Sequence, residues 1–235
     1  KSCRAQITKE QCDAIVGTIP SETTCYAERD IDYTYVGNPL AQKYIGVNAY
    51  SPQGPIALLP GSRSQEIARL VPEFIAVARA MPKQAFVLIR PESAVPVWPN
   101  LEIPENIKLF TGELKNGMEH CSAALVCSGT ATLEVALMGV PQLVVYRANP
   151  LSLAIAKRFV KIRYISLPNL ILNAGALPEL LQEDARSEAL VERLSDLLAD
   201  PSDQLVAYTN LLQVLEQKDP AATAAGHILT ISSEV

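Results

Sequence analysis

The sequence is poor in the residues that build metal centres and disulfide frameworks. Its 235 residues include only two histidines, His120 and His227, which are far apart and lack metal-ligand spacing. Its five cysteines are scattered and contain no C-x-x-C pair, which argues against a zinc site and against a disulfide framework. We therefore predict a protein of a reducing compartment that has no metal site and no cofactor.

The sequence also lacks long apolar runs and an excess of positive charge. No apolar run approaches the ~18 residues that a membrane-spanning helix requires. The 20 basic and 25 acidic side chains give a net charge of −5, which disfavours non-specific binding to nucleic acids. With 49% hydrophobic residues, the chain is too apolar for intrinsic disorder, and its length allows one large domain or two small ones. These features fit a cytoplasmic protein that works beside a membrane without crossing it.

Short apolar runs alternate with helical patterns from about residue 52 onward. Apolar positions recur at helical spacing in 64–81, and a further helix is expected at about 132–138. Strands that consist of continuous apolar residues and alternate with helices predict βαβ units. We therefore predict an α/β fold with a doubly wound, Rossmann-like parallel sheet. The expected strands of this sheet lie at 56–59, 85–89, 107–110, 123–127 and 142–146.

The regions on either side of this pattern differ from it. Residues 1–51 contain two strand-like runs, at 14–19 and 33–36, which are too few for an independent domain. We predict a complete domain at 52–200, preceded at 1–51 by the end of another domain and a linker. Residues 201–235 are expected to form a C-terminal helix and a weakly patterned tail. The helices expected after Pro178 lie at 179–182, 187–199 and 203–217.

The first candidate site, with the sequence LPGSR, follows the first strand of the predicted domain. Gly61 allows a tight turn and a close approach of the backbone to a ligand. Ser62 offers a hydroxyl and an N–H group, and Arg63 offers a fixed cation for a phosphate. The helix that follows, with Ser64 as its expected cap, adds partial positive charge. The alternative is an ordinary strand–helix turn with a surface arginine, because the motif is neither G-x-G-x-x-G nor a Walker P-loop.

The second candidate site, with the sequence SGTATLE, also joins a buried strand to a helix. The hydroxyls of Ser128, Thr130 and Thr132, together with Gly129 and a helix N-terminus, suit a diphosphate bound through neutral donors. Glu134 lies about one turn into the helix, where its carboxylate can accept hydrogen bonds from ribose hydroxyls. The alternative is ordinary capping of the helix by Ser128 or Thr130.

Together these segments resemble the donor half of GT-B glycosyltransferases. One combination of motifs resembles, more specifically, the lipid-A-disaccharide synthase family. The motifs are VGNPL at 36–40, LPGSR at 59–63, SGTATLEVALMGVP at 128–141, YISLPN at 164–169 and PELLQ at 178–182. The sequence departs from the family pattern at Asn38, where histidine is common, and at 171–176, which lacks the usual charged residues.

The resemblance implies an inverting transfer of diacylglucosamine from its UDP carrier to diacylglucosamine 1-phosphate, with release of UDP, in lipid A biosynthesis. It implies no catalytic residue within the chain, because the general base is expected in an N-terminal domain of which residues 1–51 would be the end. The chain alone is therefore expected to bind UDP or its sugar weakly and to transfer nothing. Another UDP-sugar GT-B enzyme, such as an epimerase or a different glycosyltransferase, and a non-catalytic nucleotide-sugar-binding module remain alternatives. The implied donor-binding residues are Gly61, Ser62, Arg63, Ser128, Gly129, Thr130, Thr132, Glu134 and Asn169.

A basic stretch, KRFVKIR, places Lys157, Arg158, Lys161 and Arg163 close together. Beside apolar residues, such a stretch can contact anionic headgroups or a lipid phosphate at a membrane surface. The alternative is a solvated helix end whose cations suit the C-terminal dipole. The expected partners are UDP-linked acylated glucosamine, acylated glucosamine 1-phosphate and the inner face of a membrane, to which the protein would attach peripherally. Nucleic acid is not an expected partner. An incomplete domain would expose apolar surface, so the chain is expected to pair either with itself, as a homodimer, or with the missing half.

Overall fold

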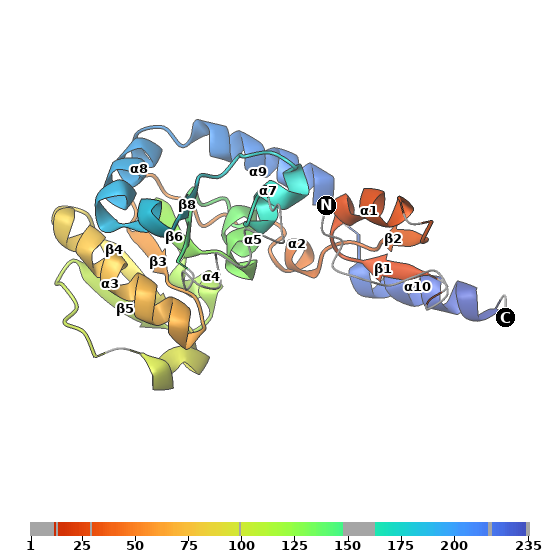
Figure 1. Ribbon diagram of the computed structural model, residues 1–235, viewed down its shortest axis with the longest axis horizontal. Helices are drawn as coiled ribbons and strands as arrows, with labels where there is room; N and C mark the ends of the chain where they lie inside the picture. The colour runs from red at the N-terminus through yellow and green to blue at the C-terminus, as the bar shows by residue number, and fades with distance from the viewer. Residues whose placement is uncertain are drawn as a thin grey trace.

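The computed structural model describes Cys12 and residues 14–28, 30–98, 100–147, 163–215 and 218–233. Figure 1 shows a larger part, in which helices surround a sheet, and a smaller part that contains the first described strands. The larger part contains a six-stranded parallel sheet in the order β5-β4-β3-β6-β7-β8. Its strands are β3 (Ile56–Leu59), β4 (Phe86–Arg90), β5 (Ile107–Thr111), β6 (Ala123–Cys127), β7 (Gln142–Tyr146) and β8 (Glu179–Leu181).

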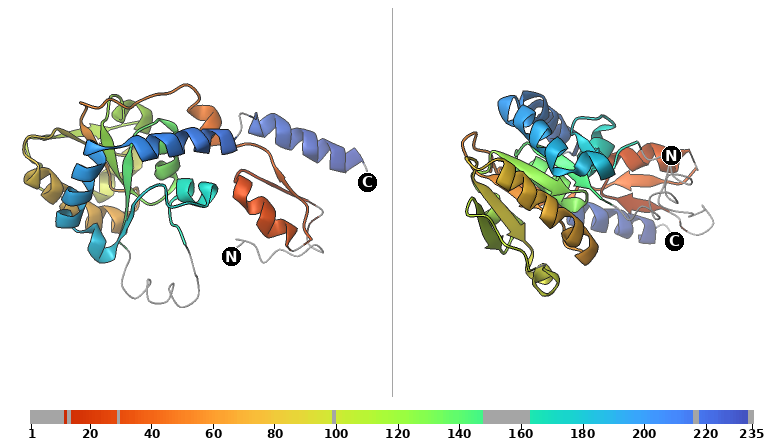
Figure 2. Two further views of the ribbon diagram at one scale, coloured as in Figure 1. Left: turned by 90° about the horizontal axis from the view of Figure 1, so that it is seen from above. Right: turned by 60° about the vertical axis from the view of Figure 1, so that its left-hand side comes forward.

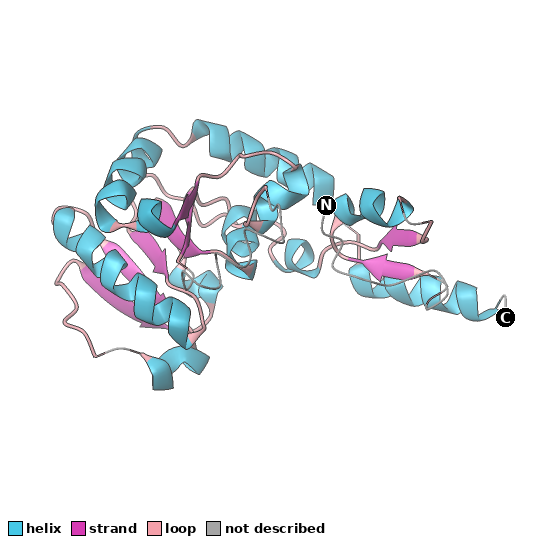
Figure 3. Cartoon of the chain, in the orientation of Figure 1, coloured by secondary structure: helices cyan, strands magenta, loops and turns pink. Residues whose placement is uncertain are grey.

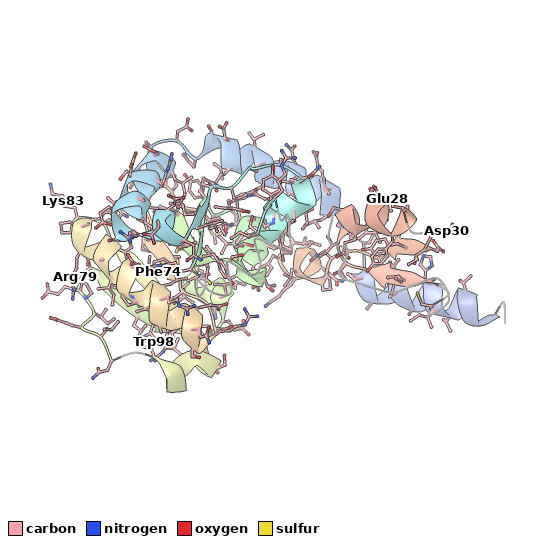
Figure 4. All side chains as sticks on the ribbon, viewed as in Figure 1. Glu28, Asp30, Phe74, Arg79, Lys83 and Trp98 are labelled. Carbon is pink, nitrogen blue, oxygen red and sulfur yellow. The ribbon has the colours of Figure 1, made fainter. Side chains whose placement is uncertain are left out.

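One face of the sheet is covered by α3 (Ser64–Ala80) and α8 (Ser187–Ala199), which pack against each other. Successive side chains of a strand point to opposite faces of the sheet, so Ile56 and Leu58 of β3 share one face. Both are fully buried in a hydrophobic cluster that includes Phe74 of α3, labelled in Figure 4. The apolar residues that recur at helical spacing in α3 therefore form the stripe that packs on the sheet.

The opposite face is covered by α5 (Thr130–Leu137), α7 (Leu167–Leu172) and α9 (Ser202–Leu215). Ala57 and Leu59 of β3 belong to the hydrophobic cluster on this side. Figure 3 shows the strands of the larger part enclosed by helices. Because both faces are covered, β3 and β6 are buried at every position, which explains why their sequences are continuously apolar. The predicted α/β fold with a doubly wound parallel sheet is confirmed.

The order of the strands marks the place where a ligand can bind. Counted within this sheet from β3, the order is 3-2-1-4-5-6, which is the Rossmann order. β3 and β6 are neighbours, but the chain continues from β3 to one side of the sheet and from β6 to the other. The loops that follow these two strands therefore diverge and leave a crevice at the carboxyl ends of the strands.

Three local details differ from the sequence-based expectations. Residues 179–181 form strand β8 rather than a helix, because Leu180 is buried and the segment pairs with β7. Ser64 is the first residue of α3 rather than its cap, and Arg63 occupies the N-cap position. The tail expected to be weakly patterned contains α10 (Pro220–Ser233). The remaining short elements of the larger part are η3 (Glu92–Val97), α4 (Leu114–Gly117) and η4 (Gln182–Ala185).

The smaller part is built on a two-stranded parallel sheet with a separate hydrophobic cluster. The rings of Tyr26 and Tyr33 stack in this cluster with their centroids 5.0 Å apart, and Ile31 packs beside them. The two strand-like runs of the sequence are thus paired with each other and do not extend the main sheet. The elements of this part are β1 (Ile15–Gly17), η2 (Pro20–Glu22), α1 (Thr23–Ala27) and β2 (Tyr33–Tyr35).

Segments from both ends of the chain join the two parts. Asn38 caps α2 (Pro39–Lys43) by accepting a hydrogen bond from the Leu40 N–H at 2.9 Å, and its side-chain amide donates to the Thr18 carbonyl at 3.0 Å. The Tyr35 hydroxyl donates to the carbonyl of Leu215, the last residue of α9. Figure 2 shows α9 and α10 extending from the larger part towards the end of the molecule that holds the smaller sheet.

The segment that follows α2 packs on the larger part. Ala41, Tyr44 and Ala49 belong to the same hydrophobic cluster as Ala57 and Leu59 of the main sheet. These three residues belong to the region 1–51, which is predicted to be the end of another domain and a linker. Their side chains pack in the core of the larger part, next to α5.

Candidate functional site

A cavity of about 360 Å³ opens at the carboxyl ends of β3, β4 and β6. The loop between β3 and α3 forms one wall, and the loop between β6 and α5 forms another. The structure therefore brings the two predicted motifs to a single cavity, at the crevice that the strand order marks. The predicted site residues that line it are Gly61, Ser62, Arg63, Ser128, Gly129, Thr130 and Glu134.

The β3–α3 loop depends on the absence of a side chain at Gly61. Its φ angle is +95°, and a Cβ atom built at this position would lie 2.4 Å from Glu66 Oε2 and 3.2 Å from Cys127 Sγ. Glu66 is a cavity-lining residue that the sequence analysis did not assign to the site. Its position in the first turn of the helix, where an acidic residue commonly caps the backbone, was the available signal.

Glu66 also holds the arginine of the motif. Its Oε1 accepts a hydrogen bond from the Arg63 guanidinium at 2.8 Å, and its Oε2 accepts one from the Arg63 backbone N–H at 3.3 Å. The side chain of Arg63 is 82% exposed, whereas that of Glu66 is 14% exposed. The hydrogen bond and the charge of Glu66 raise the pKa of Arg63 above its ordinary value. Arg63 is therefore a permanent cation at the mouth of the cavity.

The β6–α5 loop presents backbone donors and hydroxyls. The Ser128 hydroxyl donates to the Ile165 carbonyl at 3.0 Å, which fixes this loop to the segment before α7. Thr130 and Ala131 begin α5, and the first N–H groups of a helix have no carbonyl partner within the helix. Since both residues line the cavity, the positive end of the α5 dipole lies beside it.

Two predicted site residues do not line the cavity. Thr132 is fully buried, and its hydroxyl donates to the Gly129 carbonyl at 2.7 Å, inside the turn that begins α5. Asn169 is also fully buried, and its amide makes hydrogen bonds to the backbone of Leu177 and to Glu179. Their polar atoms are therefore engaged within the fold, which the sequence pattern did not reveal.

Asn169 belongs to a polar group that we call the Glu179 cluster, formed by Glu179, Ile165, Ser166 and Asn169. The Glu179 carboxylate accepts hydrogen bonds from the N–H groups of Ile165 and Ser166, both at 2.9 Å. It also accepts from the Ser166 hydroxyl at 2.6 Å and from the Asn169 amide at 2.9 Å. Because the Ile165 carbonyl accepts a hydrogen bond from the Ser128 hydroxyl, this cluster helps to hold the β6–α5 loop in place. The sequence analysis gave Glu179 no such role.

Glu134 is held by a residue from outside both motifs. It is half-buried in the cavity wall, and its Oε1 accepts a hydrogen bond from the Tyr44 hydroxyl at 2.7 Å. Tyr44 lies just after α2 and is almost fully buried, with 2% of its surface exposed. No sequence signal links these two residues, because 90 positions separate them.

Cys127 also lines the cavity, but its chemistry is that of a buried thiol. It is 4% exposed, and burial raises its pKa to about 12, with a further contribution from the charge of Glu66. The thiolate form needed for nucleophilic attack is therefore scarce at neutral pH. Cys127 therefore acts as a small buried residue that packs beneath the loop.

The basic stretch lies largely beyond the part of the chain that the structure describes. Lys157, Arg158 and Lys161 are outside the described residues. Arg163 is described and exposed, and its guanidinium lies over the Tyr164 ring, 5.2 Å from the centroid. Within the described ranges, none of the helices has the length and apolar character needed to cross a membrane. The same residues contain no group of three or more His, Cys, Asp or Glu side chains that could hold a metal ion.

Two glycine substitutions are expected to differ in effect: one should lower the stability of the fold, and the other should weaken ligand binding. Gly61→Ala places a Cβ against Glu66 at a left-handed φ, so we expect it to lower the free energy of unfolding by about 1–3 kcal/mol. Gly129→Ala meets no atom within 4 Å, so stability should be unchanged, but the added methyl would occupy space beside the helix N-terminus. Urea unfolding and nucleotide titration of both variants measure these effects. Normal ligand binding by Gly129→Ala would argue against a ligand at this loop.

The strand order and the two loops around the cavity define a class that solved structures share. The calicheamicin glycosyltransferase CalG4 superposes with a TM-score of 0.61 at 20% identity, over 94% of this chain and 53% of that protein. The spinosyn rhamnosyltransferase SpnG, complexed with thymidine diphosphate, gives a TM-score of 0.53 at 17% identity, over 82% of this chain and 49% of that protein. The fold is that of the GT-B glycosyltransferases.

The family follows from the sequence. The family model of lipid-A-disaccharide synthetase matches residues 1–227, and the chain belongs to this family. The lipid-A-disaccharide synthase of Pseudomonas putida strain KT2440 is 35% identical over an alignment of 242 positions, which covers 95% of this chain and 64% of that protein. The resemblance identified from the motifs is therefore confirmed. The chain spans about 64% of the length of this curated relative.

Proposed function

We propose that the cavity binds the UDP group of a nucleotide-sugar donor. The observation that carries the proposal is the division of the cavity into a polar side and an apolar side at the switch point of the sheet. The β3–α3 and β6–α5 loops supply one cation, Arg63, together with hydroxyls and N–H groups. An apolar wall is formed by Ile89 of β4, Pro91 just after it and Leu114 of α4. A nucleoside diphosphate has the same division, between its charged diphosphate and its planar base.

The polar side suits the diphosphate for electrostatic reasons. Arg63 is a fixed cation that can form paired hydrogen bonds to phosphate oxygens. The N-termini of α3 and α5 add partial positive charge, and Thr130 and Ala131 at the start of α5 line the cavity. We propose that these groups neutralise the diphosphate and that no metal ion takes part.

The proposed reaction is the inverting transfer of diacylglucosamine from UDP to diacylglucosamine 1-phosphate. UDP leaves with its negative charge, and Arg63 and the two helix N-termini would stabilise that charge as it develops. Of the carboxylates that line the cavity, Glu66 is paired with Arg63, and Glu134 accepts a hydrogen bond from Tyr44. We therefore propose that the general base comes from a part of the longer family members that this chain does not match.

Two further observations support this assignment. The family name gives the class of reaction, and the described rhamnosyltransferase of the same fold was solved with thymidine diphosphate, a pyrimidine nucleoside diphosphate. A cavity of about 360 Å³ lies in the usual size range of small-molecule sites.

Because both proposed substrates carry acyl chains, we propose that the protein works in the cytoplasm at the inner face of the membrane, with the basic stretch ending at Arg163 as one contact.

Isothermal titration of the chain tests both the ligand and the absence of a metal. UDP is expected to bind with the same Kd, within about twofold, in EDTA and in excess Mg²⁺. UMP should bind about tenfold or more weakly, because it lacks the phosphate that would pair with Arg63. Equal affinities for UDP and UMP would argue against a diphosphate site. Binding that requires Mg²⁺ would show that the protein groups alone do not neutralise the ligand.

A further inference from the structure

Tyr44 is placed to control the carboxylate that faces the ribose region of the proposed donor site. Its hydroxyl donates to Glu134 Oε1 at 2.7 Å, across 90 positions of sequence. The Glu134 side chain starts from α5, whereas Tyr44 lies in the segment that follows α2. These two elements pack against each other, so the hydrogen bond joins two fixed parts of the core.

The surroundings of Tyr44 make it a rigid donor. Its ring lies in the hydrophobic cluster that supports the main sheet, with 2% of its surface exposed. Lys43 Nζ lies 5.1 Å from the ring centroid. Burial, together with the hydrogen bond and the charge of Glu134, raises the pKa of Tyr44 above its ordinary value of 10. The hydroxyl therefore keeps its proton at every physiological pH and donates to Glu134 throughout.

The hydrogen bond also decides which oxygen of Glu134 is left for a ligand. Oε1 is used by Tyr44, and Oε2 has no hydrogen-bond partner among the residues that the structure describes. Glu134 lines the cavity on the same side as Gly129 and Thr130. A glutamate side chain has several rotamers of similar energy, so a buried donor on one oxygen restricts the direction of the other.

We propose that Tyr44 is a positioning residue for donor binding, which holds Glu134 so that its free oxygen accepts a hydrogen bond from the ribose hydroxyls. This inference rests on the proposed function, because it assigns the ribose of a uridine nucleotide to Glu134. It adds a residue outside both loop motifs to the donor site. It also makes the segment after α2 a structural support of ribose recognition.

Titration of the full 235-residue chain with UDP and with 2′,3′-dideoxyuridine 5′-diphosphate tests the proposal. Tyr44→Phe keeps the ring and removes only the donor. We expect it to raise the Kd of UDP about five- to tenfold and that of the dideoxy analogue by less than twofold. Tyr208→Phe is the matched control, since it also removes a buried hydroxyl. Tyr208 lies on α9, is not among the residues that line the cavity, and donates to the Val140 carbonyl. It should lower the thermal midpoint and leave the ratio of the two Kd values unchanged.

A double variant tests whether Tyr44 acts through Glu134. In a Glu134→Ala background, Tyr44→Phe should change the Kd of UDP by less than twofold, because the group that it positions is gone. If the Tyr44→Phe chain discriminates between the two ligands as the unmodified chain does, the inference is wrong and the donor site stands. An equal loss of affinity for both ligands would also overturn it, in favour of a general structural role. If the unmodified chain does not bind UDP, the proposed function fails together with the inference.

Discussion

Replacement of Arg63 by alanine is expected to weaken UDP binding about 10- to 100-fold and to leave the fold intact. Arg63 is the only arginine or lysine that lines the cavity in the described part of the chain, and its side chain is 82% exposed. A hydrogen-bonded arginine–phosphate pair is among the stronger polar contacts in proteins. Loss of an exposed ion pair with Glu66 changes stability little. Isothermal titration gives the Kd, and thermal unfolding gives the stability.

Arg79→Ala provides the comparison for this variant. Arg79 lies near the other end of the same helix, as Figure 4 shows, and its guanidinium is 4.0 Å from Glu102. The substitution removes the same charge from α3 without touching the cavity, so UDP affinity should change by less than twofold. A similar loss of UDP affinity in both variants would indicate that the net charge of the protein, rather than a contact with Arg63, determines the affinity. In that case the role assigned to Arg63 would have to be abandoned.

Replacement of Glu179 by alanine is expected to destabilise the protein by about 3 kcal/mol. The change removes the acceptor for the N–H groups of Ile165 and Ser166, the Ser166 hydroxyl and the Asn169 amide. Ser166 and Asn169 are fully buried, so their donors cannot all turn to water, and an unsatisfied buried donor costs about 1–3 kcal/mol. For a chain of this size, the thermal midpoint should fall by roughly 6–12 °C.

The same variant should also affect the ligand site. The Glu179 cluster holds Ile165, whose carbonyl accepts from the Ser128 hydroxyl, so the second loop loses support when the cluster is disrupted. We expect weaker UDP binding together with the lower stability. Glu183→Ala is the control, because Glu183 is exposed and forms an ion pair with Arg186 in its own turn. Its midpoint should stay within about 2 °C of the unmodified chain. If Glu179→Ala is as stable as Glu183→Ala, the Glu179 cluster does not stabilise the fold.

Most of the main sheet was predictable from the sequence. The apolar runs at β3 and β6 are continuous because helices cover both faces of the sheet there, whereas β5 lies at an edge and is exposed at Lys108 and Leu109. β8 was missed, since Glu179–Leu181 is a short strand that stands next to β7 at the end of the described strand order. A segment of this length has too few positions to show a period, and only its pairing reveals its type.

The candidate site was predictable where its chemistry lies in loops at strand ends. Gly61, Arg63 and Gly129 line the cavity because parallel strands bring their carboxyl ends to one edge of the sheet. Thr132 and Asn169 carry the same kinds of polar group but are buried and bonded inside the fold. The residue types alone do not distinguish a group that faces a ligand from one that holds the backbone.

The fold class, the family and the two loops could be predicted from the sequence, because periodicity and motifs are local properties of the chain. The side chains that support these loops became known only from the packing of distant segments. Tyr44 reaches Glu134 across 90 positions, and Ser128 reaches Ile165 across 37. Such contacts depend on how the helices pack on the sheet, and no local pattern records that packing.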